Sequence, residues 1–490
     1  MQKYEGLKKA GTFTLTNGTE VLGELFLKGA ATTLDLYSGA FFDTHASSDI
    51  FGQFYDRSRV SLIKCITLSG PGTGIRGDER YHFSSLFPHF VIFGDQYVSS
   101  SDRTIRELSF TVDDATTLFY DFDAFGSVVN PQPDMVERIV EAEERGRKIG
   151  IGKYPLLFYF AGKHEIFVVD TVLGKISATH SISYRSPGPE GIHVDNTIRL
   201  NMAFNSERTV EEAIASVLDI LRFLEVIAGR PQNISKLVFL PVSAGEHPEV
   251  LDVYWCMPPR RDSDDGSRKP HPADLPIQAA RNPDEFTGVL KRWLERHDGW
   301  RNARARFSTA FAYQNRYDID RLVGAANMFD ILPPSACPET VTLPPDLDQT
   351  RDNARKAFEA LPASPERDSV LGALGRIGKA TLKRKIRSRA KLITDIVGDR
   401  FPELEVVVDQ AVDCRNYYVH GSTAKIDYSK HFDQIQFFTD TLEFVFAASD
   451  LVESGWDINA WTKQMSTLSH PFGQYRVNYA LQLSELKKLL

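Results

Sequence analysis

The spacing of apolar residues changes along this chain of 490 residues, and that change limits its fold more than any other feature. From about residue 10 to residue 125, apolar and polar residues alternate over short segments that are separated by turn residues, a pattern typical of β-strands. Beyond about residue 285, apolar residues recur every three to four positions, as they do in helices. The sequence therefore predicts an α+β, multidomain protein with a β-rich N-terminal region and an all-α C-terminal region.

The N-terminal region begins with a predicted hairpin. Segments 11–15 and 21–27 flank the turn sequence Thr16-Asn17-Gly18, which is typical of a tight connection between antiparallel strands. Further strand-like segments follow at residues 33–37, 50–54, 60–63, 89–93 and 108–112. Such close spacing favours a β-sandwich or a barrel-like unit over βαβ repeats.

A second strand-rich part extends from residue 156 to residue 201 and leads into a helix. Thr209 and Glu212 have the spacing of a capping box at the start of that helix. Segments 234–240 and 250–255 are predicted as closing strands. We place the β-rich region at residues 1–275, with residues 128–150 as a candidate division into two subdomains.

A polar, turn-rich segment at residues 258–270 is predicted to be a loop or a flexible linker. The region from 285 to 490 then predicts a bundle of four to six helices. The expected helices begin near residue 286 and continue at 307–332, 365–374, 382–397, 404–420 and 432–452. Ser364 as N-cap and Pro365 at the first helical position are expected to begin one of them.

The sequence Arg415-Asn416-Tyr417-Tyr418-Val419-His420-Gly421 ends one predicted helix. An arginine offers a charged fork of donors to phosphate oxygens, and a histidine moves protons near neutral pH. Asn416 and His420 are four residues apart and so share one helix face, and Gly421 is a typical helix-ending residue. Arg415 continues the apolar stripe of the helix, which predicts either a functional group or a snorkelling structural arginine.

The motif R-x4-H is short, and about one chance example is expected in a chain with 12 histidines. A second example, from Arg292 to His297, lies among charged residues and is interpreted as a solvated helix face. The longer spacing from Arg76 to His82 is a third, weaker example. The position of Arg415 on an apolar stripe favours the C-terminal example.

One predicted helix is strongly basic, although the chain carries a net charge of −8. From Arg376 to Lys391 there is no acidic residue, and the absence of acid partners favours a phosphate-binding face over a solvated one. The candidate RNA-binding residues are Lys379, Lys383, Arg384, Lys385, Arg387, Arg389 and Lys391.

Other motifs predict no site. Gly72–Gly77 matches G-x-G-x-x-G but precedes no apolar-periodic helix, so we interpret it as a mobile hairpin loop. Gly150-Ile151-Gly152-Lys153 lacks the hydroxyl and the spacing of a P-loop. The acids at 113, 114, 121 and 123 are interpreted as solvated strand ends rather than as a cation site.

No apolar run of signal-peptide or membrane-span length is present, and the cysteines at 65, 256, 337 and 414 are scattered. These features predict a cytoplasmic protein with buried thiols and without a membrane partner. A zinc site built from distant cysteines and histidines is the lesser alternative, and we expect no metal and no cofactor.

The C-terminal region resembles the HEPN superfamily, whose ribonuclease members carry R-x4-6-H with a polar residue after the arginine. Arg415, Asn416 and His420 match that pattern. A β-rich region followed by such a bundle is similar to the ApeA family of bacterial anti-phage, abortive-infection proteins. The N-terminal resemblance is carried by Gly23-Glu24-Leu25, Ile50-Phe51-Gly52 and Phe90–Gly94.

This resemblance implies a metal-independent endoribonuclease, with Arg415, Asn416 and His420 as catalytic residues and tRNA among the candidate substrates. It also implies a homodimer or a higher even oligomer and a phage-derived trigger. One alternative is a non-catalytic HEPN module that dimerises beside a ligand- or protein-binding β-rich region. Another is a metal- or nucleotide-dependent enzyme in the N-terminal half.

Overall fold

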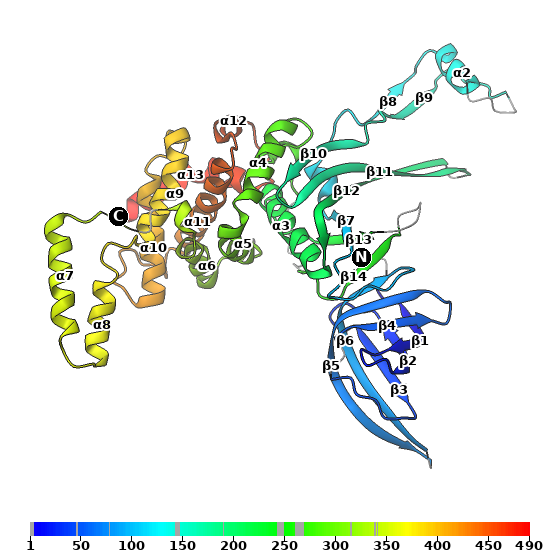
Figure 1. Ribbon diagram of the computed structural model, residues 1–490. Helices are drawn as coiled ribbons and strands as arrows, with labels where there is room; N and C mark the ends of the chain where they lie inside the picture. The colour runs from blue at the N-terminus through cyan, green and yellow to red at the C-terminus, as the bar shows by residue number, and fades with distance from the viewer. Residues whose placement is uncertain are drawn as a thin grey trace. The chain divides into compact units, whose positions relative to one another are not determined.

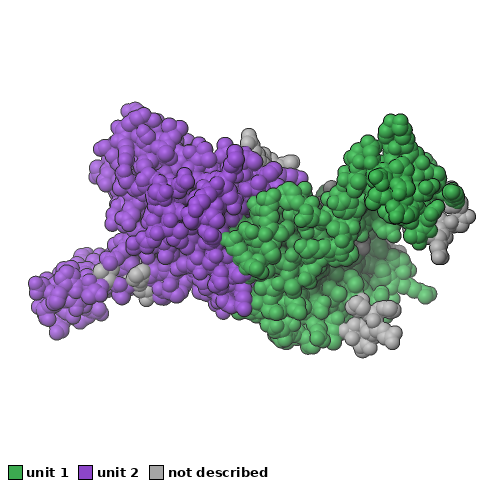
Figure 2. All heavy atoms as spheres, turned by 90° about the horizontal axis from the view of Figure 1, so that it is seen from above, with its two compact units in different colours: residues 1–220, 232–261, 277–287 green, residues 221–231, 262–276, 288–490 purple. Residues whose placement is uncertain are grey.

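The computed structural model describes residues 4–45, 48–77, 79–142, 148–189, 191–242, 249–259, 269–313, 316–337, 340 and 342–490. The chain forms two compact units, which Figure 2 shows in different colours. The first unit contains residues 1–220, 232–261 and 277–287, and the second contains residues 221–231, 262–276 and 288–490. Most of the predicted linker, residues 260–268, lies outside the described residues.

The first six strands close into a barrel. Their order is β6-β3-β2-β1-β4-β5, and β5 pairs with β6 to complete the ring through antiparallel contacts (Figure 1). Buried residues alternate with more exposed ones along the strands. On β2, for example, Val21, Gly23 and Leu25 are buried, and the residues between them are more exposed. The barrel-like unit expected from the sequence is therefore confirmed. The strands are β1 (Lys8–Thr14), β2 (Glu20–Phe26), β3 (Thr33–Ser38), β4 (Ile50–Phe54), β5 (Arg59–Arg76) and β6 (Glu79–Phe93).

Strand β6 also begins an open sheet beside the barrel. Its residues Phe90–Phe93 pair with β14, and the order continues β14-β13-β7-β12-β11-β10. A separate sheet holds β8 and β9. The strands of this part are β7 (Ile105–Val112), β8 (Phe125–Val129), β9 (Leu156–Phe160), β10 (Glu165–Thr171), β11 (Gly174–Gly188), β12 (Gly191–Arg208), β13 (Ile234–Pro241) and β14 (Leu251–Trp255).

Among the described residues, three helices lie between these strands in the sequence: α1 (Ala115–Leu118), α2 (Pro133–Glu141) and α3 (Val210–Ala228). The predicted capping box begins α3, because the Glu212 side chain accepts from Thr209 N–H and the Thr209 hydroxyl accepts from Glu212 N–H. The segment Gly72–Gly77 is not a loop. Gly72 to Arg76 pair with β6, so this part of the interpretation is wrong.

The second unit is a helical bundle around α11, which packs against α5, α6, α9, α10 and α13. Its helices are α4 (Pro283–Glu295), α5 (His297–Phe311), α6 (Ile319–Asp330), α7 (Pro345–Glu359), α8 (Pro365–Leu374), α9 (Leu382–Val397), α10 (Leu404–His420), α11 (Phe432–Glu453), α12 (Ile458–Thr462) and α13 (Pro471–Leu489). Short 3-10 turns occur at η1 (Pro272–Asp274) and η2 (Pro334–Ala336).

The predicted helices at 382–397 and 404–420 are confirmed to the residue, and Ser364 caps α8 through Arg367 N–H. The single helix expected at 307–332 is wrong. It is divided into α5 and α6, because Asp318 accepts a hydrogen bond from Arg321 N–H and begins a new helix. Helices α7, α12 and α13 were not predicted.

Buried ion pairs join the helices of the bundle. Arg304 on α5 binds Asp450 on α11 through two hydrogen bonds of 2.8 and 2.9 Å. Arg321 on α6 binds Glu443 in the same bidentate way at 2.9 and 2.8 Å. Within the described part of the chain, no helix combines the length and the hydrophobicity that crossing a membrane requires.

Candidate functional site

Helix α10 presents the R-x4-H motif at its C-terminal end. Its buried side is formed by the predicted apolar stripe of Leu404, Val407, Val408, Ala411 and Val412. The helix stops at Gly421, which has a positive φ of 67° and donates its N–H to Tyr417 O. The expected helix end is therefore confirmed, and it leaves His420 exposed at the last turn.

The Arg415 guanidinium is held by three neutral acceptors. Nη1 donates to Asn416 Oδ1 at 3.1 Å and to His420 Nε2 at 3.0 Å, and Nη2 donates to Asn327 Oδ1 at 2.9 Å. Arg415 itself is half-buried, and its Nε is buried without a hydrogen-bond partner among the described residues. The structure thus brings together the three residues that the sequence singled out.

The contact with Arg415 also assigns a role to the His420 ring nitrogen that it reaches. A guanidinium has only donors, so Nε2 must be the acceptor in this hydrogen bond. An unprotonated Nε2 that lies beside a cation is chemically able to receive a proton once the arginine is drawn to an anion.

Asn327 is the member of this site that sequence reasoning missed. It comes from α6 and approaches Arg415 across 88 positions of sequence. No local motif marks it, because Ala325, Ala326 and Met328 beside it simply belong to the buried part of the helix. The sequence shows only an amide next to the buried face of α6. Its partner, Arg415, is identified only when α6 and α10 are packed together.

The charge of Arg415 is not neutralised by an acid. The two nearest acids along α10, Asp409 and Asp413, bind Arg387 and the pair Lys383 and Lys425. Burial opposes ionisation of Asp413, but the two lysines outweigh it and lower its pKa. Among the described residues, no carboxylate forms an ion pair with Arg415, so its charge stays available to an anion.

The basic helix α9 differs from its prediction in two ways. Its acid partners are not missing, because Asp409, Asp413 and Asp395 bind Arg387, Lys383 and Lys391. The expectation of an unpaired basic face is therefore wrong for these three residues. The Lys385 ammonium group donates to the backbone oxygen of Asp330 at 2.8 Å.

The predicted RNA-binding role fails most clearly for Arg389. Its side chain is 1% exposed and binds Glu453 at 2.8 Å and Ser449 at 2.9 Å inside the bundle. A buried arginine cannot contact RNA, so its assignment to the RNA-binding face is wrong. Lys379 and Arg384 are exposed, and no ion pair is found for either among the described residues.

The other R-x4-H segment also differs from its interpretation as a solvated face. Arg292 is exposed and donates to Ser454 O at 2.6 Å, but His297 is buried. Arg296 binds Asp450 at 3.0 Å and also Glu453. This segment joins α4 and α5 to α11 and has a structural role.

The remaining candidates hold no cluster of ligands. The described residues contain no group of three or more His, Cys, Asp and Glu side chains that could hold a metal ion. Of the acids expected at solvated strand ends, Asp114 is buried and accepts from Gln232 at 2.7 Å. Cys256, Cys337 and Cys414 are buried as expected, and Cys65 is half-buried.

Comparison with known families agrees with this arrangement. Residues 8–293, more than half of the chain, match the model of ApeA N-terminal domain 1. Residues 323–459 match the Apea-like HEPN model, and this range contains Asn327 and the whole R-x4-H motif. Comparisons with curated proteins and with solved structures gave no match. The chain therefore belongs to the ApeA family, and its helical unit contains a HEPN domain.

Proposed function

We propose that this protein is a metal-independent HEPN endoribonuclease that acts in anti-phage defence by abortive infection. The observation that carries the proposal is the Arg415 guanidinium, which is aimed by neutral groups and lies 3.0 Å from His420 Nε2. A fixed cation beside a proton acceptor is what cleavage by the 2′-hydroxyl of RNA requires. The family model for the HEPN domain supports the same activity.

Arg415 would bind the scissile phosphate. Its donors now point at Asn416, Asn327 and His420, which are weaker acceptors than a phosphate oxygen. An incoming phosphate would take one or more of these donors and release the Nε2 lone pair of His420. The same cation would stabilise the negative charge that develops on the phosphate oxygens in the transition state.

The chemistry forms one bond and breaks one. The 2′-oxygen attacks phosphorus while the bond from phosphorus to the 5′-oxygen breaks, which yields a 2′,3′-cyclic phosphate and a 5′-hydroxyl. A neutral His420 would accept the proton of the 2′-hydroxyl, and a protonated imidazole would donate to the leaving 5′-oxygen. Asn416 would position Arg415, because its Oδ1 accepts from Nη1.

Two chains would supply the two imidazoles. One His420 acts as base or acid at a given moment, so a cleft shared across a two-fold axis would hold both groups. Tyr417 and Val419, which precede His420 by three residues and by one residue, are 37% and 43% exposed. Such apolar exposure beside the motif is what an interface between two HEPN domains would cover.

The β-rich unit would sense the phage-derived trigger. Its long β11–β12 hairpin carries exposed apolar side chains, with Tyr184 at 78% and Ile192 at 69% exposure. An exposed apolar surface of this kind is typical of protein-binding sites. Cellular RNA, with tRNA as the first candidate, would be the substrate that the activated enzyme destroys.

The decisive experiment measures cleavage of labelled RNA by the purified chain and growth arrest in cells. His420→Ala should lower the cleavage rate by about 10²- to 10⁴-fold, because it removes the proton-transfer group. Arg415→Lys keeps the charge but loses the fork of donors, and should lower the rate by about 10²-fold or more. Cleavage should persist in excess chelator and leave cyclic phosphate ends.

Two outcomes would contradict the proposal. Wild-type cleavage by both folded variants would remove the assigned site. Loss of activity in chelator, with recovery on addition of magnesium or manganese, would place the chemistry elsewhere in the chain.

A further inference from the structure

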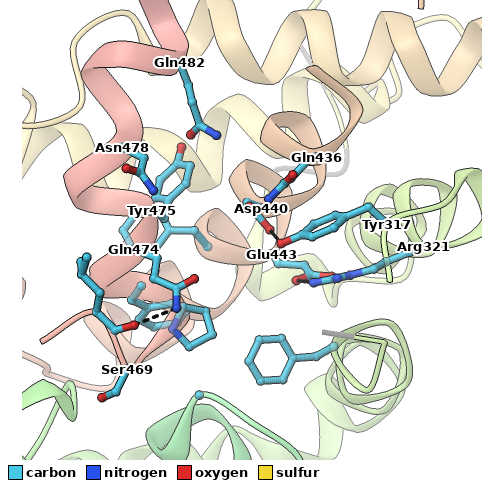
Figure 3. Close-up of a pocket in the computed structure, with 16 residues that line it drawn as sticks. Tyr317, Arg321, Gln436, Asp440, Glu443, Ser469, Gln474, Tyr475, Asn478 and Gln482 are labelled. Atoms are coloured by element: carbon cyan, nitrogen blue, oxygen red, sulfur yellow. Dashed lines mark hydrogen bonds and ion pairs between the residues drawn. The ribbon is translucent and has the colours of Figure 1, made fainter. Parts of the chain in front are cut away.

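A cavity of about 470 Å³ opens in the helical unit away from the R-x4-H motif. Figure 3 shows α13 on one side of it, with Tyr317 and Arg321 on the other and α11 between them. The volume lies in the range of sites for small organic molecules. None of Asn327, Arg415, Asn416 and His420 lines it, so it is separate from the proposed nuclease site.

The charged groups of this cavity do not balance. Arg321 binds Glu443 through two hydrogen bonds, and the pair is neutral overall. Asp440 Oδ1 accepts a hydrogen bond of 2.8 Å from the Tyr317 hydroxyl, which carries no charge. Among the described lining residues, Arg321 is the only cation, so one carboxylate remains in excess.

Unused amides surround that carboxylate. Gln436 comes from α11, and Asn478 and Gln482 come from α13. The described residues provide no hydrogen-bond partner for these three side chains. Buried aromatic side chains of Phe311, Phe444 and Tyr475 form the apolar part of the wall.

We infer that this cavity binds a small organic cation with N–H donors, of the guanidinium or primary ammonium class. The excess carboxylate of Asp440 would receive the charge, and aromatic faces favour cations over neutral molecules of equal size. The amide oxygens of Gln436, Asn478 and Gln482 would accept the remaining N–H groups. A phosphate-bearing ligand is disfavoured, because the only cation among the described lining residues is already bound to Glu443.

The titration of Asp440 agrees with this assignment. Burial, aided by the negative charge of Glu443, raises the pKa of Asp440 to about 7, against the opposing effects of Tyr317 and Arg321. Besides Asp440, the titratable lining residues among those described are Glu443, Tyr317, Arg321 and Tyr475, and Tyr475 comes from α13. A bound cation favours the ionised carboxylate, so binding should strengthen as the pH rises from 6 to 8.

Some residues that line the cavity lie outside the range that matches the HEPN family model, residues 323–459. Tyr317 and Arg321 precede residue 323, and Asn478 and Gln482 follow residue 459. Arg321 and Asn327 lie six residues apart on α6, roughly 9 Å along the helix axis. Helix α6 therefore carries one residue of the cavity and one of the nuclease site.

The test compares n-butylguanidinium with n-butylurea, a neutral molecule of the same shape, by saturation-transfer NMR and calorimetry on the full chain. We expect the cation to bind at least tenfold more tightly than the urea at pH 7.5. Asp440→Asn removes the charge but keeps an acceptor for Tyr317, and should abolish this preference. Asn478→Leu should weaken binding of the cation while leaving its pH dependence unchanged.

Equal binding of the two compounds would overturn the inference, and so would undiminished cation binding by Asp440→Asn. No binding of n-butylguanidinium at about 10 mM by the folded wild type would also overturn it. Circular dichroism of each variant checks folding. RNA cleavage is not the readout, so failure here is distinct from failure of the proposed nuclease function.

Discussion

At the scale of single residues, the environment of Arg415 distinguishes a functional arginine from a structural one. Arg304, Arg321 and Arg389 are buried against carboxylates, and their charges hold helices together. Arg415 is bound only by an imidazole and two amides among the described residues. Neutral acceptors orient a guanidinium without cancelling its charge, which suits the binding of an anion.

Asn327 provides a test of this distinction. Asn327→Asp keeps the size of the side chain but places a carboxylate 2.9 Å from Nη2, where it would compete with phosphate. We expect this variant to raise KM for RNA by about tenfold or more, since about 1.4 kcal/mol of competing attraction has that effect. Asn327→Ala loses only one positioning hydrogen bond and should mainly lower kcat.

Steady-state cleavage kinetics of the two variants separate these effects. A purely structural asparagine would give the same change for both, because each would act only through loss of stability. Thermal unfolding of both proteins serves as the control.

Asp440 predicts a pH dependence of stability. Its pKa is about 7 in the folded chain, above the ordinary value of 3.8. The folded state therefore binds more protons than the unfolded state between about pH 4 and pH 7, and stability is lost as the pH rises through that window. Glu443 lies on the same helix, and Arg321, Tyr317 and Tyr475 come from the elements packed around it.

Asp440→Asn removes this titration. The free energy of unfolding of the variant should therefore increase relative to that of the wild type as the pH is raised from 5 to 8. Urea unfolding at several pH values measures the difference. A difference that is constant with pH would show that Asp440 is ionised in the folded chain throughout this range.

At the scale of elements, helix α9 has a structural face and an exposed face. Arg389 and Ile386 are buried in the bundle, while Arg387 and Lys383 bind the acids of α10. Charge reversal on the paired residues would place acid against acid and would disturb the packing of α9 on α10. An RNA-binding test must therefore use residues outside these pairs.

Lys379 and Arg384 are the appropriate residues. Lys379→Glu and Arg384→Glu should weaken RNA binding at every sequence and reduce the slope of log affinity against log salt by about one for each phosphate that is no longer bound. Filter binding between about 50 and 300 mM salt measures the slope. Lys356→Glu, on helix α7, is the matched control with the same change of charge, because Lys356 is exposed and no ion pair is found for it among the described residues. An unchanged slope would mean that Lys379, which precedes α9, and Arg384, on α9, bind no phosphate.

At the scale of the whole molecule, the proposed mechanism requires more than one chain. One His420 provides one proton-transfer group, whereas the reaction uses a base and an acid. We expect a dimer, or a multiple of it, whose two His420 side chains share one cleft. Mixing Arg415→Ala chains with His420→Ala chains should restore activity only in part, because each shared cleft still lacks one arginine and one histidine.

Sedimentation and dilution test this assembly. Specific cleavage activity should fall when the chain is diluted below its dimer dissociation constant. A monomer that cleaves at an undiminished specific rate would contradict the shared cleft. A stable dimer without nuclease activity, with or without phage lysate, would instead favour a non-catalytic dimerisation module.

The local features of this protein follow from its sequence. Helices α9 and α10, the turn at Gly18 and the capping box of α3 were predictable, because propensity, caps and apolar spacing act over a few residues. The residues of the R-x4-H motif were predictable for the same reason. They lie close together near the end of one helix.

The contacts between polar residues that are distant in the sequence depend instead on how the helices and strands pack. The Asn327–Arg415 contact, the burial of Arg389 against Glu453 and the ion pairs between α9 and α10 join residues that are far apart in sequence. Closure of the barrel through β5 and β6 is likewise a matter of register between whole strands. Such pairings depend on how apolar faces pack against each other, and a single sequence does not record that packing.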